Sequence, residues 1–247
     1  MFAVNNINLY EGEEFMFYPG FLFDSTYLIL IPAMIIAFWA QFKIDSAYKK
    51  YKTVRTLSGV TGGEVARSIL DGAGLFDVRV ERYGKQLGDH YDPSARVIRL
   101  SPEVHDSATV AAAGIAAHEC GHAIQHQTHY APLALRTKIA PVVNIGSSIS
   151  IYLFMIGIFL GNPLFAKVGI IFFSGAVIYQ IITLPVEFNA STRALNILKT
   201  RTFLYGDELK GAQKVLDAAA MTYVAATLMA ISQLIRLIAI NNRYNDN

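Results

Sequence analysis

Two histidines and a glutamate stand at a spacing that could bind and use a metal ion. They are His118, Glu119 and His122 in the run His-Glu-Cys-Gly-His. On an α-helix, residues four apart are rotated by only about 40°, so both imidazoles can face one ion. Neutral imidazoles bind Zn²⁺, and an adjacent carboxylate can take a proton from a coordinated water. The spacing predicts a zinc hydrolase site with Glu119 as general base, and the alternative is a pair of surface histidines on an ordinary helix.

The residues around this motif are typical of the helix that it needs. Residues 107–127 are rich in alanine, and Asp106 or Ser107 is available as an N-cap. Gly121 destabilises a helix by about 1 kcal/mol relative to alanine, which indicates that another segment approaches closely there. Cys120 is the only cysteine, which excludes an internal disulfide, and it is more typical of a small buried residue than of a metal ligand.

Long uncharged stretches indicate a membrane protein. Hydrophobic residues make up 53% of the 247-residue chain, and they are concentrated in runs. No charge occurs from Ser25 to Phe42, from Ile139 to Ala166 or from Val168 to Val186. Each run reaches or approaches the length of about 20 residues that a span requires. Three spans are expected, and the more polar residues 218–235 form a fourth helix that either spans or packs against the others.

The charges beside the first run predict its orientation. Its N-terminal flank is acidic, unlike the basic start of a cleavable signal peptide, so we expect a retained anchor. The positive-inside rule places the basic residues that follow it in the cytoplasm and the N-terminus outside. These basic residues are Lys43, Lys49, Lys50, Lys52 and Arg55. The net charge of +2 indicates no nucleic-acid surface.

The segment between the first two spans has the composition of a globular domain. Residues 43–138 contain charges and turn residues, and we expect the catalytic domain here. Thr61 followed by Glu64 predicts a capping box for a helix over about residues 62–72.

Two short strands are predicted in the same segment. Residues 78–83 and 95–100 alternate apolar and polar side chains, and Gly84 and Gly88 mark turns. In many zinc peptidases an edge strand lies above the metal and pairs with an extended substrate. The second of the two stretches is the predicted edge strand.

A second set of polar residues follows the later spans. Gly161-Asn162-Pro163 predicts a turn between two membrane helices, which returns the chain to the cytoplasm. Glu187 stands where the apolar stretch ends, on the membrane face predicted for His118 and His122. A carboxylate there must be solvated, paired or bound to a cation. The residues alone leave two interpretations open: Glu187 is a third metal ligand, or it is an interfacial residue that pairs with Arg193 or a nearby lysine.

Five separated strings of residues carry a family resemblance. They are Gly88-Asp-His-Tyr-Asp-Pro93, Ile98-Arg-Leu-Ser101, Ala117-His-Glu-Cys-Gly-His-Ala-Ile-Gln125, Pro185-Val-Glu-Phe-Asn-Ala-Ser191 and Thr222-Tyr-Val-Ala-Ala226. Together they resemble the bacterial neutral zinc metallopeptidases of the YugP type. That family resembles the gluzincins, in which a glutamate on a second helix completes the zinc shell, so the resemblance implies that Glu187 is the third ligand.

One position departs from the more distant relatives. Membrane peptidases related to HtpX and Ste24 have an aspartate four residues after the ligand glutamate, and here Ser191 stands at that place. Ser191 or Asn189 could instead form a hydrogen bond to a ligand histidine.

The resemblance implies a mainly α membrane protein. An α+β zincin-like catalytic domain with a small β-sheet is joined to three or four transmembrane helices. The expected segments are an N-terminal extracytoplasmic segment (1–22), a first transmembrane helix (23–42), a catalytic domain (43–138), a transmembrane hairpin (139–186), a second catalytic segment (187–217) and a fourth membrane or membrane-packed helix (218–240).

The expected activity is that of a zinc-dependent endopeptidase in a multi-pass cell-membrane protein, with its site on the cytoplasmic side. The expected zinc ligands are His118, His122 and Glu187. Glu119 activates the attacking water and carries its proton to the leaving amine. The candidates for stabilising the developing oxyanion are His90, Tyr91 and Tyr223. The expected partners are the lipid bilayer and a peptide or membrane-protein substrate, with no nucleic acid.

Other functions remain open. A non-catalytic scaffold or chaperone could hold a structural metal, but such a site needs no general base such as Glu119 and usually has four protein ligands. An intramembrane protease of the site-2 type carries a Leu-Asp-Gly after its motif, whereas Leu70-Asp-Gly72 precedes it here. Metzincins need a histidine where Thr128 stands. His126 and His129 are expected to be surface or interfacial residues.

Overall fold

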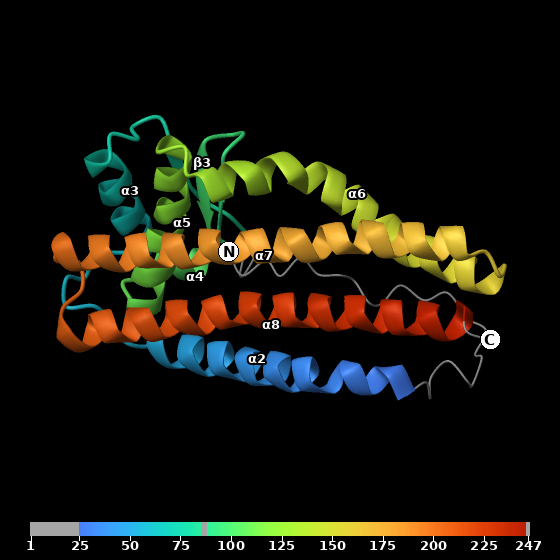
Figure 1. Cartoon of the computed structure of the whole chain (residues 1–247). Coiled ribbons are helices and arrows are strands. Elements are labelled where there is room, and N and C mark those ends of the chain that lie inside the picture. The colour runs from blue at the N-terminus through green and yellow to red at the C-terminus, as the bar shows by residue number, and fades with distance from the viewer. Residues whose placement is uncertain (1–24, 85–87, 246–247) are drawn as a thin grey trace. The chain divides into compact units, whose positions relative to one another are not determined.

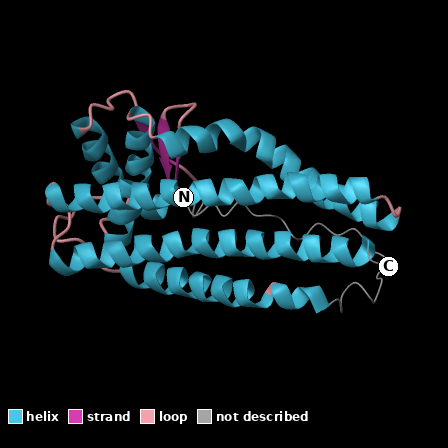
Figure 2. Cartoon of the chain, viewed as in Figure 1, coloured by secondary structure: helices cyan, strands magenta, loops and turns pink. Residues whose placement is uncertain are grey.

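The described chain is mostly helical and contains one small sheet (Figures 1 and 2). The computed structural model describes residues 25–84 and 88–245, so the predicted extracytoplasmic segment 1–22 lies outside the described residues. The elements are η1 (Ser25–Ile29), α2 (Ile31–Tyr51), α3 (Gly62–Gly72), β1 (Arg79–Arg82), β2 (His90–Asp92), β3 (Val97–Leu100), α4 (Pro102–His105), α5 (Val110–Gln127), α6 (Ala131–Phe159), α7 (Pro163–Thr200) and α8 (Gly206–Asn245). The predicted class, a mainly α protein with a small sheet, is confirmed.

The chain forms two compact units. The first contains Ala40–Ala134 and Pro185–Thr222. The second contains residues 25–39, Leu135–Leu184 and residues 223–245. The histidine motif and Glu187 belong to the first unit.

The sheet has three strands in the order β1-β3-β2. β3 lies in the centre, parallel to β1 and antiparallel to β2, with Tyr91 opposite Ile98. The prediction that residues 95–100 form the edge strand is therefore wrong. The edge strand beside β3 is instead β2, which lies between the two predicted strands and was not itself predicted. A strand of only three residues is too short to show an alternating pattern.

Two helices of the first unit begin at side-chain caps. Thr61 and Glu64 form the predicted capping box of α3, since the Glu64 amide donates to Thr61 Oγ1 and the Thr61 amide donates to Glu64 Oε2. The N-cap of α5 is Thr109, whose Oγ1 accepts from the Ala112 amide at 3.3 Å. The prediction of Asp106 or Ser107 as this cap is wrong, because these two residues precede the cap in the link from α4.

The motif helix α5 is buried along most of its length, which explains its alanine content. Small side chains let neighbouring elements pack closely around it. At Gly121, an added Cβ would lie 2.7 Å from the carbonyl oxygen of Ala190 on α7. This confirms the expected close approach and places the α7 backbone directly against α5.

The second unit contains the predicted helical hairpin. α6 and α7 are joined at a turn where Gly161 has a φ of +65°, a conformation that favours glycine. The two helices are in contact through small residues, because an added Cβ at Gly157 would overlap the backbone nitrogen of Ala166. An added Cβ at Gly169 would likewise lie 2.6 Å from the carbonyl oxygen of Ser150.

Three helices in the described part of the chain are long and apolar enough to cross a membrane: α6, α7 and α8. α8, which contains residues 218–235, therefore has the length and apolar composition of a membrane span, a point that the sequence left open. α2 is not among these three, since Gln41, Lys43 and Asp45 interrupt the apolar run that begins at Ile31. A span over residues 23–42 remains a prediction.

Replacing Gly121 with alanine is expected to destabilise the protein by about 1–3 kcal/mol, because the new methyl group would overlap the α7 backbone. Gly175→Ala on α7 is the matched control, since an added Cβ there meets nothing within 4 Å. The control should keep or raise the thermal midpoint, because alanine favours a helix by about 1 kcal/mol. Thermal unfolding in detergent measures both variants. Equal midpoints for Gly121→Ala and wild type would disprove the close approach.

The thiol of Cys120 is expected to resist alkylation in the folded protein at neutral pH. The side chain is fully buried, its Sγ lies 3.5 Å from the carbonyl oxygen of Ala66, and burial raises the thiol pKa well above its usual value. The thiolate is therefore scarce as well as inaccessible. Mass spectrometry after iodoacetamide treatment should find modification only in denaturant. Rapid modification of the native protein would contradict this packing.

Candidate metal centre

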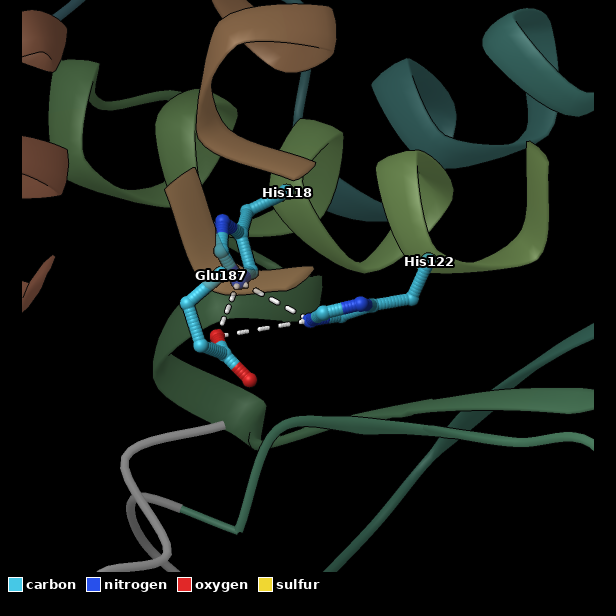
Figure 3. Close-up of side chains that lie close together, drawn as sticks. All are labelled: His118, His122 and Glu187. Carbon is cyan, nitrogen blue, oxygen red and sulfur yellow. Dashed lines mark hydrogen bonds and ion pairs between the residues drawn. The ribbon is translucent and has the colours of Figure 1, made fainter. Parts of the chain in front are cut away.

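Three side chains from two helices converge on one point (Figure 3). His118 and His122 come from α5, and Glu187 comes from α7. The Nε2 atoms of the two histidines are 3.1 Å apart, and Glu187 Oε2 lies 3.3 Å from His118 Nε2 and 3.6 Å from His122 Nε2. His118 and Glu187 are buried, and the side chain of His122 is 12% exposed. The structure thus brings together the three residues that were predicted to be ligands.

The chemistry and spacing of these three atoms fit a zinc ion. Two donors that are each about 2.1 Å from a tetrahedral ion lie about 3.4 Å apart. The observed separations of 3.1, 3.3 and 3.6 Å bracket that value. Two imidazole nitrogens and one carboxylate oxygen, with a fourth position left for water or substrate, are the donor set of catalytic zinc sites.

The centre also favours positive charge. Burial lowers the pKa of the His122 imidazole, but Glu187, Glu119 and Gln125 together raise it, so that the pKa lies above its usual value. A buried carboxylate therefore attracts either a proton or a metal cation to this position. Metal binding would displace that proton.

Each histidine is held by a second hydrogen bond on the side away from the centre. His118 Nδ1 lies 3.1 Å from the hydroxyl of Ser191, one of the two partners that the sequence suggested. His122 Nδ1 lies 3.0 Å from Gln125 Oε1. Gln125 is fully buried, and its role was not predicted. The signal that could have revealed it is its position on α5, three residues after His122 on the same helix face.

The edge strand β2 holds Glu119. The Tyr91 amide donates to Glu119 Oε2 at 3.0 Å, so this amide points away from β3 and toward the motif helix. The Tyr91 hydroxyl also lies 2.9 Å from Nδ1 of His126, one turn after His122. Two contacts thus join β2 to α5, and they fix the carboxylate that was expected to act as general base.

The other predicted site residues have different surroundings. His90 Nδ1 lies 2.6 Å from the Gly88 carbonyl oxygen and its Nε2 lies 3.4 Å from Arg99, while Asp92 accepts from the same guanidinium at 3.0 Å. Because side chains alternate along a strand, His90 and Asp92 lie on the face of β2 opposite to the Tyr91 side chain. Tyr223 lies on α8 in the second unit. The oxyanion roles of His90 and Tyr223 remain predictions.

Asp89 anchors the start of β2. It is fully buried, and its carboxylate accepts from the Ser101 amide at 2.7 Å and from the Ser101 hydroxyl at 3.3 Å. Burial raises the pKa of this carboxyl, and the bond from the Ser101 amide opposes that shift. Asp89 therefore ties β2 to the beginning of α4 and holds the edge strand beside the motif helix.

Comparison with known proteins agrees with this geometry. The family described as "Putative neutral zinc metallopeptidase" matches residues 26–242. A protein of Bacillus subtilis (strain 168), named "Putative membrane protease YugP", is 50% identical over 212 residues, which cover 86% of this chain and 94% of that protein. No solved structure shows a significant match. The chain belongs to the neutral zinc metallopeptidase family.

Proposed function

We propose that this chain is a membrane-embedded, zinc-dependent endopeptidase whose catalytic centre faces the cytoplasm. The observation that carries the proposal is the convergence of His118, His122 and Glu187 beside a buried Glu119. A purely structural metal site would have no use for that fourth residue and usually has four protein ligands. The same observation therefore disfavours a scaffold with a structural metal.

The three converging side chains are the proposed zinc ligands. When bound, Zn²⁺ supplies a Lewis acid that acidifies a water molecule and polarises the scissile carbonyl. Glu119 accepts the proton of the attacking water and delivers it to the leaving amine. The Tyr91 amide keeps the carboxylate of Glu119 in place for both transfers.

The edge strand β2 is the proposed binding site for the substrate backbone. In an antiparallel ladder, the amide and carbonyl of one residue point to the same side. Because the Tyr91 amide points away from β3, its carbonyl also faces the open edge of the sheet. An extended peptide that adds to this edge would lie next to Glu119, and the backbone bonds would favour an internal peptide segment over a specific side chain.

The membrane topology supports a cytoplasmic centre and substrates at or in the membrane. Basic residues from Lys43 to Arg55 follow the first apolar run, and the uncharged turn at Gly161 joins α6 and α7. The positive-inside rule then places the basic end in the cytoplasm and the turn outside. Proteins or peptides of the cell membrane are the substrates that such a site would meet.

Replacing Glu119 with glutamine is expected to keep the zinc and reduce turnover by at least about 10²–10⁴, because glutamine cannot accept the proton. Glu187→Gln is expected to lose the zinc, because a neutral amide binds the ion far more weakly than a carboxylate. Metal content by mass spectrometry and cleavage of casein or of the chain itself measure the two effects on detergent-purified protein.

Glu64→Gln is the matched control for both substitutions, since a capping box accepts glutamine. It should keep zinc and activity. Full zinc and activity in Glu187→Gln would exclude that residue as a ligand, and a wild-type protein that binds no zinc would overturn the proposed enzyme.

The orientation predicts different labelling of two leucine positions after substitution by cysteine. Leu57 is 85% exposed close to the basic segment, and Leu160 is 63% exposed at the α6–α7 turn. A membrane-impermeant maleimide should label Leu160→Cys in intact cells and Leu57→Cys only after permeabilisation. Buried Cys120 adds no background signal. The reverse pattern would place the centre on the outer face.

A further inference from the structure

Gln125 connects the motif helix to α7 by hydrogen bonds whose directions can be assigned. Its side-chain nitrogen donates to the Val186 carbonyl oxygen at 2.8 Å and to Asn189 Oδ1 at 3.0 Å. A main-chain carbonyl can only accept, so the amide nitrogen of Gln125 must face Val186. The amide oxygen of Gln125 therefore faces His122 Nδ1, 3.0 Å away.

The orientation of Asn189 is set in the same way. Arg193 Nε donates to Asn189 Oδ1 at 2.8 Å, and a guanidinium can only donate. The side-chain oxygen of Asn189 must therefore face both Arg193 and Gln125. A series of hydrogen bonds thus connects Arg193 through Asn189 and Gln125 to His122. The guanidinium of Arg193 can only donate and the carbonyl of Val186 can only accept, so these two groups fix the orientation of both amides.

We propose that Gln125 is a positioning residue that holds His122 in the tautomer required for zinc binding. An amide oxygen accepts, so Nδ1 of His122 carries the proton and Nε2 keeps its lone pair. That lone pair faces the point where His118 and Glu187 converge. α7 would then contribute the ligand Glu187. Through Val186 and Asn189 it would also fix the orientation of Gln125, and so the tautomer of a ligand on α5.

The two histidines differ in this respect. Ser191, the partner of His118, has a hydroxyl that can donate or accept, so it leaves either tautomer of that ring possible. The amide oxygen of Gln125 can only accept, so it permits only the tautomer of His122 that is protonated at Nδ1. Partners of this kind typically change metal affinity about 10–100-fold when they are removed. We therefore expect the larger loss of affinity at Gln125.

The test measures zinc affinity by competition with a chelator of known affinity, together with the melting temperature of the metal-free protein. Gln125→Leu is expected to weaken zinc binding about 10–100-fold. Gln127→Leu, an exposed position on the same helix, is the matched control and should leave the affinity unchanged. Unchanged zinc affinity in Gln125→Leu would overturn the proposal, even if the metal-free protein melted at a lower temperature.

A pair of variants at Asn189 keeps the proposal testable if Gln125→Leu fails to fold. Asn189→Asp retains an oxygen for Gln125 and Arg193 and should bind zinc as wild type does. Asn189→Leu removes that oxygen and should bind zinc more weakly. Equal zinc affinity of the two variants would show that Asn189 does not position Gln125. The inference rests on the proposed function, but the two can be refuted separately. A wild-type protein that binds no zinc would refute the proposed enzyme. Normal zinc binding by the Gln125 and Asn189 variants would refute only the positioning role.

Discussion

The candidate centre depends on the close contact of α5 and α7 at Gly121. With no side chain at this position, the α7 backbone at Ala190 comes within reach of the motif helix. Glu187 lies almost one turn before Ala190, so the contact sets the distance from its carboxylate to both histidines. Any larger side chain at Gly121 would push the two helices apart and separate the three donor atoms.

Around this contact, the protein buries polar groups in an otherwise apolar core. The part of α5 before His118 is valine, alanine, isoleucine and glycine, whereas the motif and Gln125 place several polar side chains in a few turns. Burial of a polar group is unfavourable by several kcal/mol unless hydrogen bonds compensate. Here Ser191, Gln125 and Tyr91 provide such bonds to His118, His122 and Glu119, respectively. The same bonds fix the orientation of His118, His122 and Glu119, so the interactions that compensate for burial also arrange the candidate centre.

The helix α7 contains both a long apolar stretch and Glu187. It runs without interruption from Pro163 to Thr200, is apolar enough to cross a bilayer, and carries Glu187 in the part that belongs to the first unit. Pro185 stands two residues before Glu187, at the point where the chain passes from the second unit to the first.

The features that depend on neighbouring residues could be predicted from the sequence. The ligand spacing of His118 and His122, the capping box at Thr61, the turn at Gly161 and the close approach at Gly121 could all be predicted, because helix periodicity and glycine conformation are local properties. Contacts between distant segments could not be predicted in this way. The contact of Tyr91 with Glu119 and the bonds of Gln125 to α7 join residues that are 28 or more positions apart. The strand β2 pairs with a nearby segment, but its three residues are too few to show an alternating pattern. Spacing along the chain carries no information about which distant surfaces meet. The residues alone therefore left two interpretations of Glu187, a third ligand or an interfacial residue. The packing of α7 on α5 then places its carboxylate beside both histidines.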